Sequence, residues 1–177
     1  MSLRATAAPA VSLFLLSASL PAAPGPAASA GGIAWKVPAR WTAGAGSAMR
    51  VAAYAVPAAQ GAEKGECAVF FFGPGQGGGV DDNVARWGKQ FEGTPAPQRS
   101  TQTVAGLHVT RAAVAGTYLA PGGPMMQSTG KKAGYRLLGA IVEAPGGNVF
   151  FKLTGPAPTI AAAQADFDAL VASIHKQ

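Results

Sequence analysis

Residues 135–174 read YRLLGAIVEAPGGNVFFKLTGPAPTIAAAQADFDALVASI, and this stretch decides the fold class. Two apolar segments, 135–143 and 148–153, flank a Pro-Gly-Gly turn, which is the pattern of a β-hairpin. From 156 to 174 the apolar side chains recur with a period near 3.6, which predicts an amphipathic helix with Thr159 as a candidate cap. A hairpin followed by such a helix predicts an antiparallel sheet with a helix packed against it.

Further strands are predicted upstream of this stretch. Alternating or continuous apolar residues, ended by proline, glycine or polar turns, predict strands at 33–37, 48–56, 67–72, 99–104 and 107–119. The last two form a hairpin, and the run 67–72 (CAVFFF) is expected in the interior of the sheet because it is apolar on both faces.

A second helix is predicted between these strands. Val80, Val84, Trp87 and Phe91 lie on one helical stripe, with capping candidates at 81–83 (Asp, Asp, Asn). The order of strands, helix, strands, helix predicts an α+β fold: an antiparallel sheet flanked by helices, in an α/β/α sandwich.

Composition limits the class of protein further. Of 177 residues, 49% are hydrophobic and only 12% are charged, against about 25% charged residues in an ordinary soluble domain. The length allows one domain plus a tail. The single cysteine, Cys67, excludes a disulfide framework and is expected to be an inert thiol in the core.

Residues 1–30 have the layout of a cleavable secretory signal peptide: a basic start, a short apolar stretch and small residues at the end. Ala28-Ser29-Ala30 fits the requirement of signal peptidase for small side chains, and cleavage after Ala23 is the alternative. The apolar stretch is much shorter than the roughly 20 residues of a membrane-spanning helix. We therefore expect an exported protein, periplasmic or extracellular, with a single domain at 31–177 and no transmembrane segment after cleavage.

The net charge of the mature part is modest. Arg4 falls in the signal segment, which leaves 13 basic against 8 acidic residues. Lys131, Lys132 and Arg136 form a dense basic patch at the end of 120–133, a segment without periodicity that is expected to be a long loop. The patch has only three basic residues, and export argues against nucleic acid, so we expect no nucleic-acid partner.

Motifs for cofactor or catalytic chemistry are weak. Gly73-x-Gly75-x-x-Gly78 precedes a helix as a dinucleotide-binding loop would, but Asp81 and Asp82 place negative charge where phosphates would bind. A structural turn is the preferred interpretation. Ser128-x-x-Lys131 has the spacing of a serine–lysine pair, but the companion motifs of penicillin-binding enzymes are missing.

Metal and cofactor sites are not expected either. His108 and His175 have no further ligand at the spacing that a metal site needs. We therefore predict neither a cofactor nor a metal.

Several motifs together suggest a family: Trp35-x-x-Pro38-x-x-Trp41, the strand at 48–56, Asn83-Val84-x-Arg86-Trp87, the run 150–156 (FFKLTGP) and the closing helix. Over most of 33–175 the chain resembles exported bacterial proteins with the PsbP-like fold. This fold is shared with the photosystem II extrinsic protein PsbP and a Ran-binding nuclear import factor. The resemblance implies an α/β/α architecture and a binding or accessory role, without any catalytic signature.

We therefore expect a non-enzymatic exported accessory or binding module that acts through a protein or envelope partner. Its candidate binding residues are Met125, Met126, Lys131, Lys132 and Arg136, or a groove beside Trp87. Arg86 is a further candidate, which would bind an anionic group in a site near 73–79. Two alternatives stay open: a hydrolase or transferase with a site near 73–79, and a purely structural envelope domain.

Overall fold

The computed structural model describes residues 27–47, 49–120 and 130–177. Its main sheet is antiparallel, with the strand order β3-β4-β5-β9-β8-β7-β6. These strands are β3 (Thr42–Ala43), β4 (Arg50–Val56), β5 (Gly65–Phe71), β6 (Gln98–Val104), β7 (Leu107–Ala120), β8 (Gly130–Ala144) and β9 (Gly147–Pro156).

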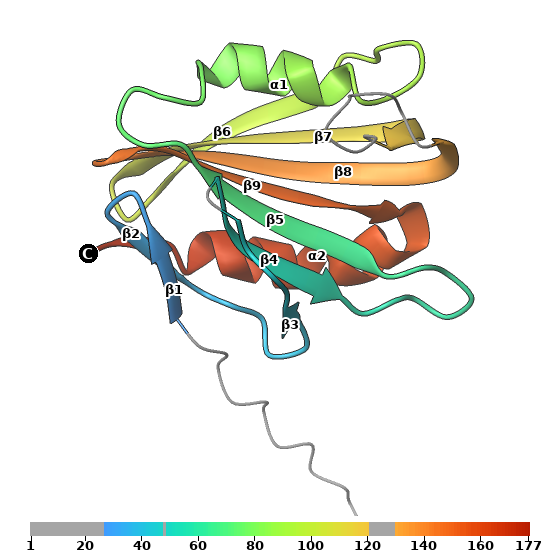
Figure 1. The fold of residues 1–177 in the computed structure, drawn as a ribbon, viewed down its shortest axis with the longest axis horizontal. Coiled ribbons are helices and arrows are strands. Elements are labelled where there is room, and N and C mark those ends of the chain that lie inside the picture. Colours follow the sequence, from blue (N-terminus) through green and yellow to red (C-terminus); the bar gives the residue numbers. More distant parts are fainter. Residues whose placement is uncertain (1–26, 48, 121–129) are drawn as a thin grey trace, which may run out of the picture.

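A small second sheet has the order β1-β2-β10, and two helices complete the described fold. These elements are β1 (Ala27–Ala30), β2 (Ile33–Lys36), β10 (His175–Lys176), α1 (Val80–Gly88) and α2 (Ala157–Ala172). The helices cover opposite faces of the main sheet (Figure 1). The predicted α+β class, an antiparallel sheet flanked by helices, is confirmed.

Two apolar cores lie on the two sides of the sheet, because side chains alternate along each strand. On β9, Phe151 and Leu153 belong to the larger core beneath α2, whereas Phe150 belongs to the smaller core beneath α1. The small sheet closes one end of the larger core with Ile33 and Trp35, which are fully buried. The interior position expected for 67–72 is confirmed, since β5 lies between β4 and β9.

Helix α1 begins and ends differently from the prediction. It stops at Gly88, before Phe91, and Gly79 is its N-cap without a side-chain capping bond. Asn83 does not cap the helix. Its Nδ2 donates to the carbonyl oxygens of Gly77 and Gly79, both at 2.8 Å, so it fixes the preceding turn.

Helix α2 also lacks the predicted cap. Pro156 is its N-cap residue, and Thr159 is fully buried inside the first turn. The Thr159 hydroxyl donates to the carbonyl of Glu63 at 2.7 Å and accepts from the amide of Ala59 at 3.2 Å. Thr159 therefore attaches the loop before β5 to the helix.

The prediction of a long loop over 120–133 is wrong for its last residues, because β8 already begins at Gly130. Strand β8 pairs with β7 along its length, across an irregularity between Gly116 and Tyr118. Strands β1, β3 and β10 were not predicted. Ala27–Ala30, which the sequence assigns to the signal segment, pair with β2, while residues 1–26 lie outside the described residues.

Neither α1 nor α2 reaches the length and apolar character that crossing a membrane requires, and the described ranges hold no other helix.

Candidate functional site

A pocket of about 650 Å³ opens on the face of the main sheet that carries α1. Its aromatic lining consists of Phe70, Phe72, Tyr118 and Tyr135. Its charged lining consists of Arg50, Glu63, Lys64, Glu66, Lys132 and Lys152. A volume of this size, with an apolar wall and a few polar groups, is typical of sites for small molecules.

Strand β9 places Lys152 inside this pocket. Along β9, Phe150, Lys152 and Thr154 alternate with the residues of the larger core, so they share the face of α1. The cross-strand neighbours of Lys152 are Ala68 on β5 and Gly139 on β8. Both neighbours are small, but the Trp87 ring lies over Gly139, and the Lys152 side chain is half-buried along the pocket wall.

The Lys152 amine has neutral hydrogen-bond partners. Its Nζ donates to Oε1 of Gln90 at 2.8 Å and lies 3.4 Å from the hydroxyl of Tyr118, with the centre of the tyrosine ring 5.8 Å away. Among the described residues, no carboxylate lies within salt-bridge distance of this amine. Burial lowers the pKa of Lys152 to about 8, although the negative charge of Glu66 opposes that shift.

Backbone pairing holds the two partners of Lys152 in place. The amide of Leu119 donates to the carbonyl of Gln90 at 2.8 Å, and the amide of Glu92 donates to the carbonyl of Thr117 at 2.9 Å. The segment that follows α1 is thereby attached to the end of β7. The rings of Phe91 and Tyr118, 5.3 Å apart, pack together at this junction.

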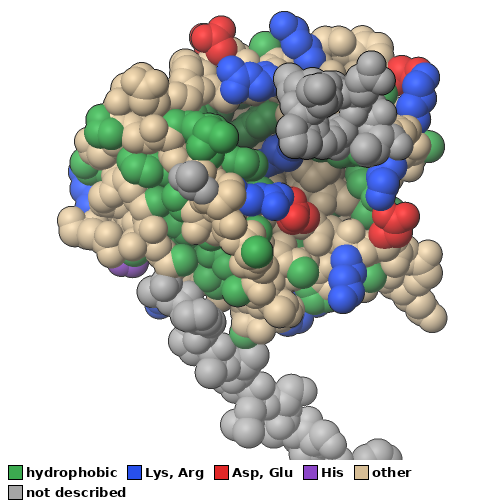
Figure 2. Space-filling model, in the orientation of Figure 1, with side chains coloured by type: hydrophobic (Ala, Val, Ile, Leu, Met, Phe, Trp, Pro, Cys, Tyr) green, Lys and Arg blue, Asp and Glu red, His purple; other side chains and the backbone are tan. Residues whose placement is uncertain are grey.

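Ion pairs surround the pocket on its solvent side. Arg50 pairs with Glu66, and Lys132 pairs with Glu63 at 2.9 Å. The hydroxyl of Tyr135 donates to the same Glu63 oxygen at 2.7 Å, and the hydrogen bond from Lys132 is the main reason that the pKa of Glu63 is lowered. Figure 2 shows such adjacent basic and acidic side chains on this face.

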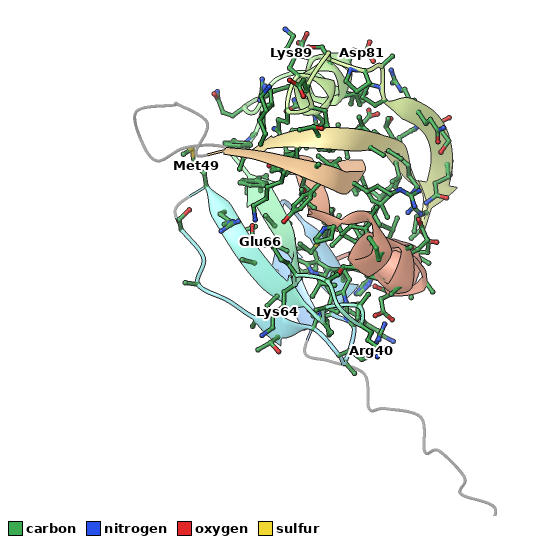
Figure 3. The ribbon with its side chains drawn as sticks, turned by 90° about the vertical axis from the view of Figure 1, so that its right-hand side faces the viewer. Arg40, Met49, Lys64, Glu66, Asp81 and Lys89 are labelled. Atoms are coloured by element: carbon green, nitrogen blue, oxygen red, sulfur yellow. The ribbon has the colours of Figure 1, made fainter. Side chains whose placement is uncertain are left out.

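Two cations of the pocket stay without an acidic partner. Within the described ranges, neither Lys64 nor Lys152 forms an ion pair. Figure 3 places Lys64 and Glu66 on the same side of the molecule as Met49, which is 59% exposed at the pocket mouth. The pocket therefore has an excess of positive charge over its two glutamates.

The aromatic side chains that line the pocket form two stacked pairs. Phe70 and Phe72 stack with ring centres 6.3 Å apart, and Tyr118 and Tyr135 stack at 5.8 Å with nearly parallel planes. The Thr154 hydroxyl lies in the same lining, and it is buried without a hydrogen-bond partner among the described residues. Flat apolar surfaces of this kind suit an aromatic ligand.

The basic patch predicted from the sequence is divided by the structure. Lys132 lies on the pocket rim, and Lys131 pairs with Glu92. Arg136 lies in a different groove of about 450 Å³, lined also by Arg111 and by residues of α2. Strict alternation would place Lys132 and Arg136, four positions apart, on one face of β8, but the irregularity in its pairing with β7 between Gly116 and Tyr118 puts them on opposite faces.

Neither Trp87 nor Arg86 is among the residues that line the pocket. Met125 and Met126 lie outside the described residues. Trp87 is only 5% exposed and packs against the sheet in the smaller core. Arg86 donates to the side-chain oxygen of Asn83 at 3.1 Å.

The weaker motifs fall at separate places. The glycines of the 73–79 turn adopt positive φ at Gly73, Gly75, Gly77 and Gly78, as a tight structural turn requires. Ser128 lies outside the described residues. No group of three or more His, Cys, Asp or Glu side chains that could hold a metal occurs in the described part of the chain.

Lys152, Tyr118 and Gln90 were missed by the sequence reasoning. One signal was present: Lys152 interrupts an apolar run, and its neighbours Phe151 and Leu153 are buried. A lysine at such a position either reaches solvent or enters a pocket. The sequence alone offered no means to choose between these, because Gln90 and Tyr118 are distant along the chain.

No protein-family model matches the chain, and no curated protein matches its sequence. Among solved structures, the chain is similar to cyanobacterial PsbP (CyanoP) from Synechocystis sp. PCC 6803. That match has a TM-score of 0.45 and 12% sequence identity, and it covers 83% of this chain and 88% of CyanoP. A PsbP structure is thus among the similar folds, as the sequence resemblance predicted, and the likeness concerns the fold alone.

A crystal structure of a protein from Bacteroides thetaiotaomicron VPI-5482 is also similar. Its TM-score is 0.40 and its sequence identity is 10%. The match covers 84% of this chain and 47% of the Bacteroides chain, so this protein spans about half the length of that one.

Proposed function

We propose that this protein is an exported, non-enzymatic binding module whose pocket on the α1 face of the main sheet holds a small anionic ligand with an aromatic body. The observation that carries the proposal is a pocket of about 650 Å³ in which Lys64 and Lys152 have no carboxylate partner among the described residues. Export is supported by the signal-like segment 1–30, and it places the ligand outside the cytoplasm.

The charge of the pocket selects the ligand class. Glu63 and Glu66 are already engaged by Lys132 and Arg50, so the two remaining cations attract a negative group. The partly buried amine of Lys152 loses hydration in the folded state, and an anion would restore a charged partner to it. The stacked pairs Phe70–Phe72 and Tyr118–Tyr135 then accept the apolar part.

A role for a protein or envelope partner is a second part of the proposal. The rim residue Lys132 and the groove residue Arg136 are available on two different faces, so a partner would meet one of them and not the combined patch. We place the partner at the rim of the pocket, where Met49 is the most exposed large apolar side chain of the described residues. Such a partner would receive or deliver the ligand.

The test of ligand binding uses thermal unfolding with 4-methylbenzoate and its neutral analogue 4-methylbenzamide. A ligand that binds only the folded state raises the melting temperature as its concentration increases. We expect the carboxylate to raise it much more than the amide. In the double variant Lys64→Met, Lys152→Met the difference between the two compounds should disappear.

A matched control removes two positive charges elsewhere. Lys36 and Lys89 are exposed and do not line the pocket, so the double variant Lys36→Met, Lys89→Met should keep the preference for the carboxylate. Equal shifts with both compounds, or loss of the preference in this control, would refute a pocket that selects anions.

A further inference from the structure

We propose that Lys152 binds carbonyl compounds covalently, forming a reversible imine with an aldehyde or ketone group of a ligand in the pocket. This inference rests on the proposed function of the pocket and adds a reactive group to it. The site consists of the Lys152 amine, the Tyr118 hydroxyl 3.4 Å from it and the Gln90 amide oxygen at 2.8 Å.

The position of Lys152 suits a nucleophilic amine. It lines the pocket, so a ligand can reach Nζ, and its cross-strand neighbours Ala68 and Gly139 have no long side chain that could cover the nitrogen. A lysine becomes a nucleophile when an apolar environment or a nearby cation disfavours its protonated form. The first condition holds here, since Phe70 and the Tyr118 ring line the pocket beside the amine, whereas the charge of Arg50 is already paired with Glu66.

A nucleophilic lysine also needs an environment in which no carboxylate contacts its amine. A carboxylate in contact with the amine would hold it protonated, but Glu66 pairs with Arg50 and Glu63 pairs with Lys132. Gln90 accepts one hydrogen from the amine without adding a negative charge. The nitrogen is therefore oriented by neutral groups, and its lone pair is available near pH 8.

The reaction is balanced by the residues present. The neutral amine attacks the carbonyl carbon, a C–N bond forms, and a proton moves from nitrogen to oxygen to give a carbinolamine. The Tyr118 hydroxyl donates its proton to the carbinolamine hydroxyl, which leaves as water while the nitrogen lone pair forms the C=N bond. The nitrogen proton then returns to the Tyr118 oxygen. The sum is amine plus carbonyl giving imine plus water, without an oxidant or a reductant.

Tyr118 is suited to that role because burial raises its pKa and keeps it protonated. Its ring is fixed between Phe91 and Tyr135, with centre-to-centre distances of 5.3 and 5.8 Å. The cations at Lys64 and at the rim favour carbonyl compounds that also carry an anionic group, such as aromatic aldehydes with a carboxylate.

The experiment incubates the purified protein with 4-carboxybenzaldehyde and sodium cyanoborohydride at pH 8, followed by intact-mass measurement and peptide mapping. Reduction of the imine adds the mass of the probe less one oxygen atom. We expect Lys152 to be labelled at least ten times faster than the exposed Lys36 and Lys89. The variant Lys152→Arg keeps the positive charge but lacks the nucleophile, so the fast labelling should be lost.

Tyr118→Phe tests the proton donor. It should slow labelling of Lys152 by about 100-fold, which is the usual contribution of general acid catalysis, while 4-methylbenzoate still raises the melting temperature. Labelling of Lys152 at the rate of Lys36 and Lys89, or fast labelling that persists in Lys152→Arg, would overturn the imine proposal. If 4-methylbenzoate binds in that case, the proposed anion pocket stands. If it does not bind either, both proposals fail.

Discussion

Lys152 is a cation with an unusual environment for its charge. It lies on an interior strand, between Ala68 and Gly139, and its hydrogen-bond partners are the neutral groups of Gln90 and Tyr118. A charge held in this way destabilises the folded protein, because it loses hydration and gains no opposite charge in contact. Retaining such a residue is reasonable where a ligand supplies the missing interaction.

The first prediction concerns stability and pH. The charged groups facing Lys152 in the pocket are Glu66 and Arg50, and burial lowers the pKa of Lys152 from 10.5 to about 8. Below pH 8 the amine is protonated in both states. Between pH 8 and 10.5 the unfolded chain binds more protons than the folded one, so this residue makes the free energy of unfolding rise with pH.

Lys152→Met should remove that rise and should increase the free energy of unfolding at pH 7 by roughly 2 kcal/mol. The measurement is urea unfolding at pH 7, 8, 9 and 10, compared with Lys89→Met, which removes an exposed lysine. Comparing the two variants cancels the effect of tyrosines that ionise at high pH. Identical pH profiles for both variants would contradict the assigned environment of Lys152.

At the scale of elements, the contact between α1 and the sheet depends on one glycine. Trp87 lies directly over Gly139, and a Cβ atom at position 139 would come within 2.0 Å of Cζ3 of the Trp87 ring. Helix α1 is short, so the packing of Trp87 and Val84 in the smaller core provides much of its attachment to the sheet. Gly139 is also the cross-strand neighbour of Lys152, so the contact of α1 with the sheet lies next to the pocket.

Gly139→Ala should therefore lower the free energy of unfolding by about 2–3 kcal/mol, because the indole must move out of its position. Gly44→Ala is the control, since a Cβ there would lie 3.6 Å from the Ala53 oxygen, an ordinary contact. Its effect should stay within about 0.5 kcal/mol. The smaller side chain of Trp87→Leu should reduce the cost of Gly139→Ala, which a double-mutant cycle in urea measures. Additive effects would show that the indole is not what opposes the new methyl group.

Some helices and strands could be predicted from the sequence and others could not, for physical reasons. Strand β5, the hairpin of β8 and β9 and helix α2 bury a continuous apolar face, so their periodicity is visible in the sequence. The beginning of β8 carries Lys131 and Lys132, whose exposed side chains interrupt that pattern although the backbone still pairs with β7. Strands β1, β3 and β10 have two to four residues, too few to show a period.

The site was less predictable than the fold. The sequence indicated Lys132 from its charge, and the structure places it on the pocket rim. It gave no indication that Gln90, Tyr118 and Lys152 meet, because that contact depends on how the segment after α1 is attached to β7. Trp87 was predicted to lie beside a groove, but its packing against Gly139 brings together residues that are distant along the chain, which the sequence does not show.

At the scale of the whole molecule, strands β1 and β2 are attached both to the C-terminal strand β10 and to the turn between β8 and β9. Strand β1 pairs with β2 from Ala27 to Ala30, and β2 also pairs with β10 near the C-terminus. The amide of Gly146, in the turn between β8 and β9, donates to the carbonyl of Gly31 at 2.9 Å. Ala28 and Ala30 pack against the larger core. Figure 1 shows β1 and β2 beside the C-terminal end of the chain.

This arrangement favours the second of the two cleavage positions predicted for the signal-like segment, after Ala23. Cleavage after Ala30 would remove β1 and leave the edge of β2 unpaired, whereas cleavage after Ala23 keeps the strand. We expect the exported form to begin at or before Ala27, which mass spectrometry of its N-terminal peptide measures. A chain shortened to start at Gly31 should unfold at lower urea concentration, because it loses four cross-strand pairs and two packed alanines. Exported protein that begins at Gly31, with an unchanged unfolding midpoint, would show that β1 contributes nothing to the folded state.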